Sequence, residues 1–185
     1  MRTDARRRRE RLIAEARRLF AEQGHGVALE AVAEASEVGI ATLYRNFAAR
    51  DELITAVALA IIDDVELAVA RCAEHADADA VTAWRELVDR LVELDLGALT
   101  DALGATGSAH AETDAAQRRA AAGLDALLAR LAAGGAVRAE LRAIDVVVAI
   151  SILTRPQPAA VRAATPGLVE RLVDGFVAWA APAPR

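Results

Sequence analysis

A short stretch near the N-terminus carries side chains that suit contacts with nucleic acid. Thr42, Tyr44, Arg45 and Asn46 fall within one predicted helix, and Arg50 follows shortly after it. Hydroxyl, amide and guanidinium groups can all donate hydrogen bonds to phosphate oxygens. The methyl group of Thr42 also suits contact with a thymine methyl group in the major groove. These residue types predict a DNA-contacting surface if one helix face presents them together.

Apolar spacing predicts two short helices that would position these side chains. In the first helix, apolar residues fall at i, i+3 and i+4 from residue 29. The pattern breaks at residues 36–39, where a glycine suits a turn, and resumes with Ile40, Leu43 and Phe47. Two helices joined in this way form a helix-turn-helix, whose second helix enters the major groove. The same periodicity is also typical of a plain amphipathic hairpin with a solvated polar face.

Two runs of residues resemble a known signature: Thr-Leu-Tyr-Arg-Asn-Phe at 42–47 and Arg-Asp-Glu-Leu at 50–53. They are similar to the recognition helix and the start of the fourth helix in the tetracycline-repressor-like (TetR) family of bacterial transcription regulators. The resemblance covers about the first 55 residues and includes four positions upstream of these runs: Leu12, Ala16, Phe20 and Gly24. It implies a DNA-binding head, followed by a body that dimerises through a four-helix bundle and binds a small-molecule effector.

Three positions depart from the pattern of that family. Asn46 stands where His is commonest, Glu37 occupies a turn position that is usually Gly, and Gly39 replaces a common Ser or Thr N-cap. Asn and His side chains can both donate to a phosphate. The missing capping side chain at Gly39 predicts more fraying of the recognition helix. The Glu37 carboxylate would repel a nearby phosphate.

The first helix, predicted at residues 4–23, adds basic side chains beside the recognition helix. The run Arg6–Arg9 suits phosphates or a minor groove, although a solvated helix start is the alternative interpretation. Residues 1–50 have a net charge of +3, whereas residues 51–185 have a net charge of −8. This distribution steers the N-terminal part toward DNA. The complete set of predicted DNA-binding residues is Gly39, Ile40, Ala41, Thr42, Tyr44, Arg45, Asn46, Arg50, Arg6 and Arg7.

The rest of the chain predicts further helices and no sheet-forming alternation. We expect an all-α protein with a three-helix DNA-binding head at residues 1–50 and an α-helical effector-binding and dimerisation body at 51–185. Asp79 is predicted to cap one helix, Thr113 to cap another at 114–133, and Thr165 to cap a last helix that begins at Pro166. The other predicted helices cover residues 51–72, 95–112 with flexible joints, and 143–154.

The last two predicted helices are apolar on more sides than one small body can cover. We therefore predict that they pair with their copies in a second subunit, as the family resemblance also implies. The predicted interface residues are Val147, Leu168, Leu172, Phe176 and Trp179.

A ligand pocket in the body is a second expectation, against the simpler interpretation that these apolar residues form core. Its mostly aliphatic lining indicates an apolar or amphipathic effector. The predicted lining residues are Trp84, Leu87, Leu91, Leu94, Leu124, Leu128, Val148, Ser151 and Ile152, with His110 and Arg155 as polar anchors.

Other classes of function find little support in the sequence. The His residues lack metal-ligand spacing, the Ser residues lie outside nucleophile-elbow motifs, and the single Cys72 excludes an intramolecular disulfide. We expect no enzyme activity, cofactor, metal or membrane contact, and a cytoplasmic location. The predicted function is ligand-released repression from a palindromic operator bound by a dimer. The alternative is a helical ligand- or partner-sensing protein that has lost sequence-specific DNA binding.

Overall fold

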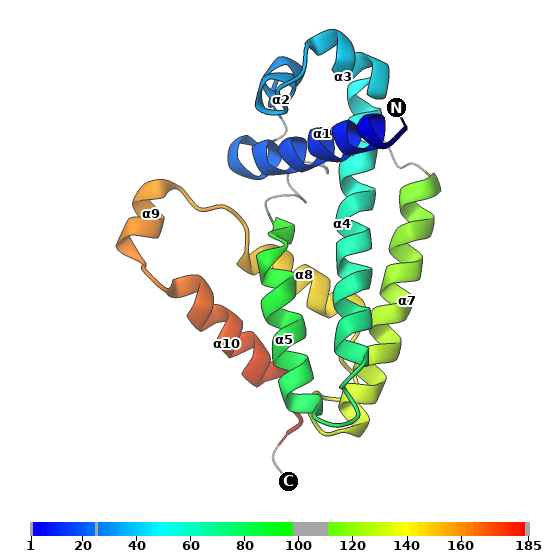
Figure 1. The fold of residues 1–185 in the computed structure, drawn as a ribbon. Coiled ribbons are helices and arrows are strands. Elements are labelled where there is room, and N and C mark those ends of the chain that lie inside the picture. The colour runs from blue at the N-terminus through cyan, green and yellow to red at the C-terminus, as the bar shows by residue number, and fades with distance from the viewer. Residues whose placement is uncertain (1, 25, 98–110, 184–185) are drawn as a thin grey trace. The chain divides into compact units, whose positions relative to one another are not determined.

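The protein is helical throughout the part that the structure describes. The computed structural model describes residues 2–24, 26–97 and 111–183, and every regular element in these ranges is an α-helix (Figure 1). This confirms the predicted all-α fold. The helices are α1 (Arg2–Gln23), α2 (Leu29–Ala35), α3 (Ile40–Asn46), α4 (Arg50–Ala73), α5 (Ala80–Glu93), α7 (Ala111–Ala133), α8 (Ala143–Leu153), α9 (Ala159–Ala164) and α10 (Leu168–Ala180).

Contacts divide the described residues into two units, which we call the head and the body. The head comprises the residues up to Ile61 together with 111–114, and the body comprises 62–97 and 115–183. The boundary predicted at residue 50 coincides with the start of α4, whereas the contacts change from one unit to the other within that helix.

The head is organised around a small apolar core that α1, α2, α3 and the start of α4 share. Leu12 and Phe20 of α1, Val32 of α2, Leu43 of α3 and Leu53 of α4 are each at most 1% exposed. Burying a side chain of this kind stabilises a fold by about 1.5–3 kcal/mol. This core fixes which side of α3 faces outward.

The body packs α5 against α8 and α10 and contains a row of buried leucines on α7. Its α5 begins as predicted, because the Asp79 carboxylate accepts hydrogen bonds from the Thr82 backbone N–H at 3.0 Å and from the Thr82 hydroxyl at 2.7 Å. Asp125 of α7 accepts a 2.7 Å hydrogen bond from the Ala143 N–H and so holds the first turn of α8. Arg85 of α5 pairs with Asp174 of α10 at 2.6 Å.

The chain between α8 and α10 departs from the prediction. An unpredicted helix, α9, follows Pro158, because its alanine-rich sequence is a strong helix former. The Thr165 hydroxyl donates to the Val161 carbonyl, so Thr165 ends α9 instead of beginning the next helix. The last helix begins two residues later than predicted, after Gly167, whose φ of 67° is a conformation that glycine adopts without strain.

Two further expectations concern the middle of the chain. The helix predicted from residue 114 already begins at Ala111, so Thr113 lies inside α7 and is not its cap. Most of the short helix expected at 95–112 lies outside the described residues, as does His110. In the described ranges, no helix is long and apolar enough to cross a membrane.

Candidate DNA interface

A tight turn joins α2 to α3 in the head. Glu37 has a φ of 55°, in the left-handed region where most residues other than glycine are strained. The Val38 N–H donates to the Ala33 carbonyl at 2.9 Å and closes the end of α2. Gly39 is extended and caps α3 without a side-chain hydrogen bond, as its residue type requires. The turn therefore forms although both positions lack the favoured residue.

The outer face of α3 brings together the side chains that the sequence predicted. Tyr44 is 48% exposed and Ile40 is 36% exposed, while Leu43 and Phe47 are buried beneath them. Five further residues share this surface with Ile40 and Tyr44. Three of them are exposed (Gly39, Ala41 and Arg45) and two are half-buried (Thr42 and Asn46). Ile40 does not face inward, contrary to the periodicity that grouped it with Leu43 and Phe47.

Hydrogen bonds within α3 already engage two of the predicted donors. Arg45 donates from Nη2 to the Thr42 hydroxyl at 2.7 Å. Asn46 donates from Nδ2 to the Thr42 carbonyl at 2.8 Å. The Tyr44 hydroxyl has no hydrogen-bond partner among the described residues. Contacts of Arg45 or Asn46 with DNA would therefore exchange these internal bonds for external ones.

Arg50 is half-buried at the start of α4 and is bound to the rest of the head. Its Nη1 donates to the Val27 carbonyl at 2.6 Å, and its guanidinium carbon lies 5.6 Å from the centre of the Phe20 ring. The side chain thus connects α4 with the end of α1 and with the segment before α2. Sequence reasoning assigned Arg50 to phosphate contact and missed this positioning role, which depends on contacts more than twenty residues away.

In the arginine run of α1, some side chains contact other residues of the head and others do not. Arg6 pairs with Glu10 at 2.7 Å, and this carboxylate raises the pKa of Arg6 through hydrogen bonding and charge. Arg9 lies 4.7 Å over the Phe47 ring, a cation–π contact that joins α1 to the residue after α3. Arg7 and Arg8 are exposed and have no partner among the described residues. Arg9 was missed as a positioning residue.

Sequence comparison identifies the head. The sequence profile described as "Bacterial regulatory proteins, tetR family" matches residues 12–57, a span that runs from the middle of α1 through α2 and α3 into α4. The head therefore carries the sequence profile of bacterial TetR-family regulators.

Solved structures extend this likeness over nearly the whole chain. A TetR transcriptional regulator from Streptomyces coelicolor is 25% identical, with a TM-score of 0.65, and the match covers 95% of this chain and 99% of that one. A TetR regulatory protein from Mycobacterium vanbaalenii is 26% identical, with a TM-score of 0.62 and coverage of 94% and 97%. The TetR-like regulator LfrR from Mycobacterium smegmatis shares the fold at 19% identity, with a TM-score of 0.62 and coverage of 94% of each chain. No curated protein matches the sequence significantly.

The matched profile and the shared fold are those of TetR-family transcription regulators, which supports a DNA-binding regulator; members of that family are regulators rather than enzymes. The body residues predicted to bind an effector fall into two groups in the structure. Trp84, Leu87, Leu91, Leu124 and Leu128 are at most 2% exposed and pack as core.

The other predicted effector residues lie nearer the surface. Val148 and Ile152 are 46% and 65% exposed on α8, Ser151 is half-buried, and Arg155 is exposed. Leu94 is buried. The structure therefore buries the first group, on α5 and α7, and leaves the α8 residues and Arg155 nearer the surface.

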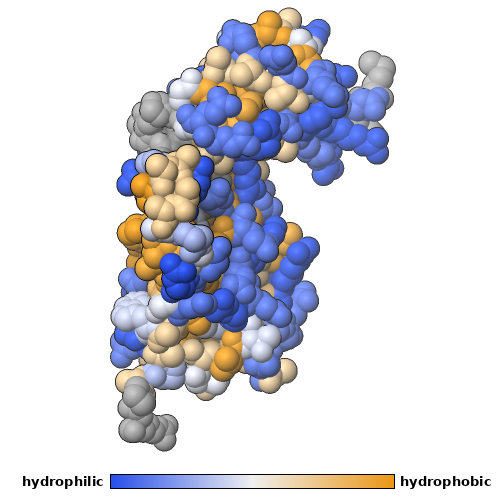
Figure 2. All heavy atoms as spheres, turned by 90° about the vertical axis from the view of Figure 1, so that its left-hand side faces the viewer, coloured by the Kyte–Doolittle hydropathy of each residue, from blue (hydrophilic) through white to orange (hydrophobic). Residues whose placement is uncertain are grey.

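The residues predicted for the TetR-type dimer interface lie on α8 and α10, which pack against each other. Leu172 and Trp179 are 46% and 49% exposed, and Val147, Leu168 and Phe176 are half-buried. Figure 2 shows the side of the body that carries α9 and α10, where apolar surface is interrupted by charged side chains.

Proposed function

We propose that this protein is a TetR-family repressor that binds a palindromic DNA operator as a homodimer and is released by a small molecule. The observation that carries the DNA-reading part is the outer face of α3. Tyr44 and Arg45 are exposed there beside half-buried Thr42, while Leu43 and Phe47 hold the opposite face in the head core. A short helix anchored on one side and polar on the other is suited to the major groove.

Each part of this face has a proposed role on the operator. Tyr44, Asn46 and Arg50 contact phosphates and fix the register of the head. The start of α3, from Gly39 to Thr42, approaches base edges because its side chains are small, apart from Ile40. Arg6 and Arg7 strengthen binding without sequence preference, since they add positive charge along the DNA backbone.

The alternative function, sensing without DNA binding, depends on Glu37 and the uncapped start of α3. Glu37 lies 3.4 Å from Arg11 of α1, so its negative charge has a positive neighbour within the head. Both side chains are largely exposed, so the pair contributes little stability, but it reduces the repulsion that Glu37 would exert on a phosphate. The contact between Glu37 and Arg11 therefore favours a DNA-binding function over sensing without DNA binding.

The homodimer is proposed from the apolar residues that α8 leaves uncovered. Ile144, Val148 and Ile152 repeat every four residues and are 64%, 46% and 65% exposed, so they form one stripe along the helix. Together with Leu172 of the adjoining α10, they suit a self-complementary interface about a two-fold axis. Such a dimer reads half-sites about 34 Å apart, one turn of DNA, or a multiple of that distance.

The effector site is proposed within the body core around Trp84. Trp84 is 2% exposed, and its indole nitrogen has no hydrogen-bond acceptor among the described residues. An unpaired buried donor is costly, so an effector with an apolar body and one acceptor atom would suit this position. The similar fold of LfrR from Mycobacterium smegmatis was solved in complex with proflavine, which supports small-molecule binding in such a body.

Selection from a random duplex library tests the DNA-reading part. Purified protein is incubated with the library at two salt concentrations, and the bound fraction is sequenced. We expect an enriched palindrome at low salt and weaker enrichment at high salt, because phosphate contacts release counterions. Absence of any enriched sequence at low salt would contradict the proposal and favour the sensing protein. Compounds are then screened for release of the protein from the selected duplex.

A further inference from the structure

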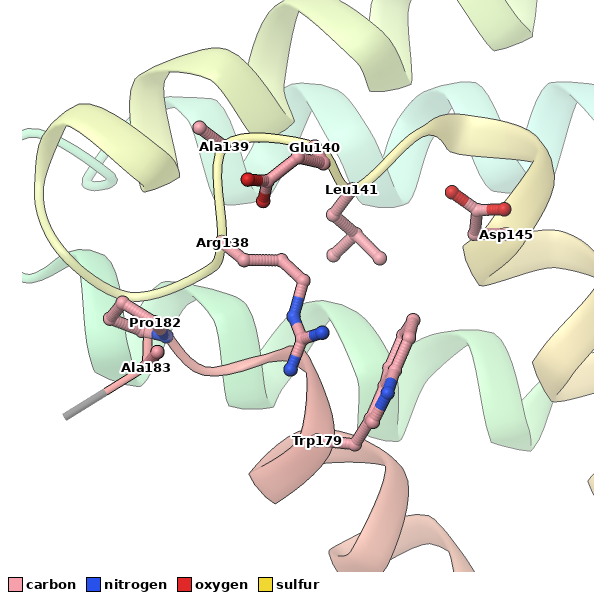
Figure 3. Close-up of a pocket in the computed structure, with 8 residues that line it drawn as sticks. All are labelled: Arg138, Ala139, Glu140, Leu141, Asp145, Trp179, Pro182 and Ala183. Atoms are coloured by element: carbon pink, nitrogen blue, oxygen red, sulfur yellow. The ribbon is translucent and has the colours of Figure 1, made fainter.

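A cavity lies at the end of the body where α10 finishes, and no residue predicted for the effector site lines it. Its volume is about 610 Å³, within the range of small-molecule sites. The loop after α7, the first turn of α8 and the residues that end and follow α10 surround it (Figure 3). The lining side chains that the argument uses are Arg138, Glu140, Leu141, Asp145, Trp179 and Pro182.

Arg138 is the charged group at the centre of this cavity. Its guanidinium carbon lies 4.3 Å from the centre of the Trp179 ring, and the side chain is half-buried between Trp179 and Pro182 (Figure 3). Its Nε atom is buried without an acceptor, and the guanidinium has no ion pair among the described residues. The backbone N–H of Arg138 donates to the Ala180 carbonyl at 2.8 Å, which holds this loop against the end of α10.

A guanidinium stacked on an aromatic ring still has donors available around its edge. Stacking uses the face of the group, whereas the N–H bonds lie in its plane and suit a carboxylate with two parallel hydrogen bonds. Leaving a half-buried charged donor without an acceptor is unfavourable. Arg138 is therefore prepared for an anion that enters the cavity.

The two acidic residues that line the cavity form no ion pair with Arg138. Asp145 accepts a 2.9 Å hydrogen bond from the Arg142 backbone N–H through Oδ2 and so serves the start of α8. Glu140 is exposed and forms no ion pair with Arg138 in the described part of the chain. Water screens both of these exposed carboxylates, so Arg138 is the one half-buried charge among the residues that line the cavity.

The remaining walls are apolar. Leu141 is 5% exposed and lies beside the Trp179 ring, with Pro182 on the other side of Arg138 (Figure 3). We propose that this cavity binds a small planar organic carboxylate, which pairs with the edge of Arg138 while its apolar part packs against Leu141, Trp179 and Pro182. This site is separate from the Trp84 core, and the inference does not depend on the proposed operator or repression.

Three probes with one ring shape and different charge test this inference: benzoate, benzamide and benzamidine. Calorimetry on the full chain measures the affinity of each, and Trp179 emission in the Trp84→Phe variant reports binding beside the ring, since Trp84 is the only other tryptophan. We expect benzoate to bind at one site per chain. Benzamide should bind at least about tenfold more weakly, because a hydrogen bond between charged groups is stronger than one to a neutral group.

Matched arginine variants assign the effect to one side chain. Arg138→Gln should weaken benzoate at least about tenfold, with Arg138→Lys as the substitute if circular dichroism shows that the glutamine variant is misfolded. Arg142→Gln should leave the affinity unchanged, because Arg142 does not line the cavity and its side chain lies 3.5 Å from Asp125.

Three results would overturn the inference. Benzamidine binding more tightly than benzoate would show that Glu140 and Asp145 govern the cavity. An equal benzoate affinity in Arg138→Gln and the native chain would place the anion elsewhere. The lack of saturable binding by any probe would show that the cavity takes no ligand of this class. None of these outcomes bears on operator selection, so the two proposals fail separately.

Discussion

Replacing Arg50 with alanine should loosen the head from within, whatever Arg50 contributes to DNA. The substitution removes the 2.6 Å hydrogen bond to the Val27 carbonyl and the positive charge 5.6 Å from the Phe20 ring. It leaves that carbonyl without its donor, next to a side chain that is 4% exposed. Both lost contacts connect α4 with the elements that support α3.

The size of the effect follows from these two contacts. A hydrogen bond to a charged group contributes about 1.5–3 kcal/mol, and a partly exposed cation–π contact contributes about 0.5–1 kcal/mol. Arg50 is half-buried, so water can reach part of the vacated space, and we take the lower ends of both ranges. The head should lose about 2 kcal/mol of stability, which corresponds to an approximately 30-fold larger opening constant.

Amide hydrogen exchange is the appropriate assay, because both tryptophans lie in the body and their fluorescence does not report on the head. Amides of α1, α2 and α3 should exchange about 30-fold faster in Arg50→Ala. Arg71→Ala is the matched control, since Arg71 is exposed near the other end of α4 and has no partner among the described residues. Unchanged exchange in the head of Arg50→Ala would refute the positioning role.

The salt dependence of DNA affinity then tests the predicted phosphate contact of Arg50 separately. Loss of one phosphate contact flattens the slope of log K against log salt by about 0.9. Arg50→Lys keeps the charge and should keep the slope. If Arg50→Ala weakens binding with an unchanged slope, Arg50 acts on DNA only through the shape of the head.

Three further predictions concern the body. Gly97→Ala should destabilise it strongly in urea unfolding followed by tryptophan fluorescence, because a Cβ there would lie 2.3 Å from a backbone carbonyl oxygen of α8. Gly175 lies in open space within α10, so Gly175→Ala should instead stabilise the body by up to about 1 kcal/mol. Equal changes in stability for the two glycine variants would contradict the close packing at Gly97. Ile152→Asp should convert the proposed dimer to a monomer in light scattering, and a retained dimer mass would remove Ile152 from the interface. Burial, followed by the charge of Glu86, raises the pKa of Cys72 to about 11. A folded-state pKa above the unfolded value adds stability that is lost as pH rises toward 11, so alkaline stability should fall in the native chain and less in Cys72→Ala.

The sequence predicted the helices whose signals are local. The periodic apolar residues gave α1 to α5, and the Asp79 cap is present because it needs only Thr82 three residues later. The predicted start of the last helix was wrong. Thr165 and Pro166 carry a good local start signal, but Gly167 supplies the left-handed turn after which α10 begins. Local pattern cannot rank two adjacent start signals when the preceding alanine-rich segment forms a helix of its own.

The candidate site was predictable where residue type and helix face suffice. Tyr44 and Arg45 had to share the face opposite Leu43, because residues on a helix are spaced by a fixed angle. The bond from Arg50 to Val27 and the stacking of Arg9 on Phe47 join positions 23 and 38 residues apart, so no local pattern marks them. The Arg138 cavity likewise depends on how the end of α10 meets a loop more than thirty residues earlier.

The central claim is that the outer face of α3 reads the operator sequence. Its most direct test compares the native protein with a variant in which Thr42, Tyr44 and Arg45 are all alanine, using the selected palindrome and a scrambled duplex of equal length. We predict that the native protein prefers the palindrome by about 10³ or more. The variant should lose this preference but keep weak, salt-dependent binding to both duplexes. A variant with unchanged preference and native circular dichroism would contradict the account, because another surface would then read the DNA.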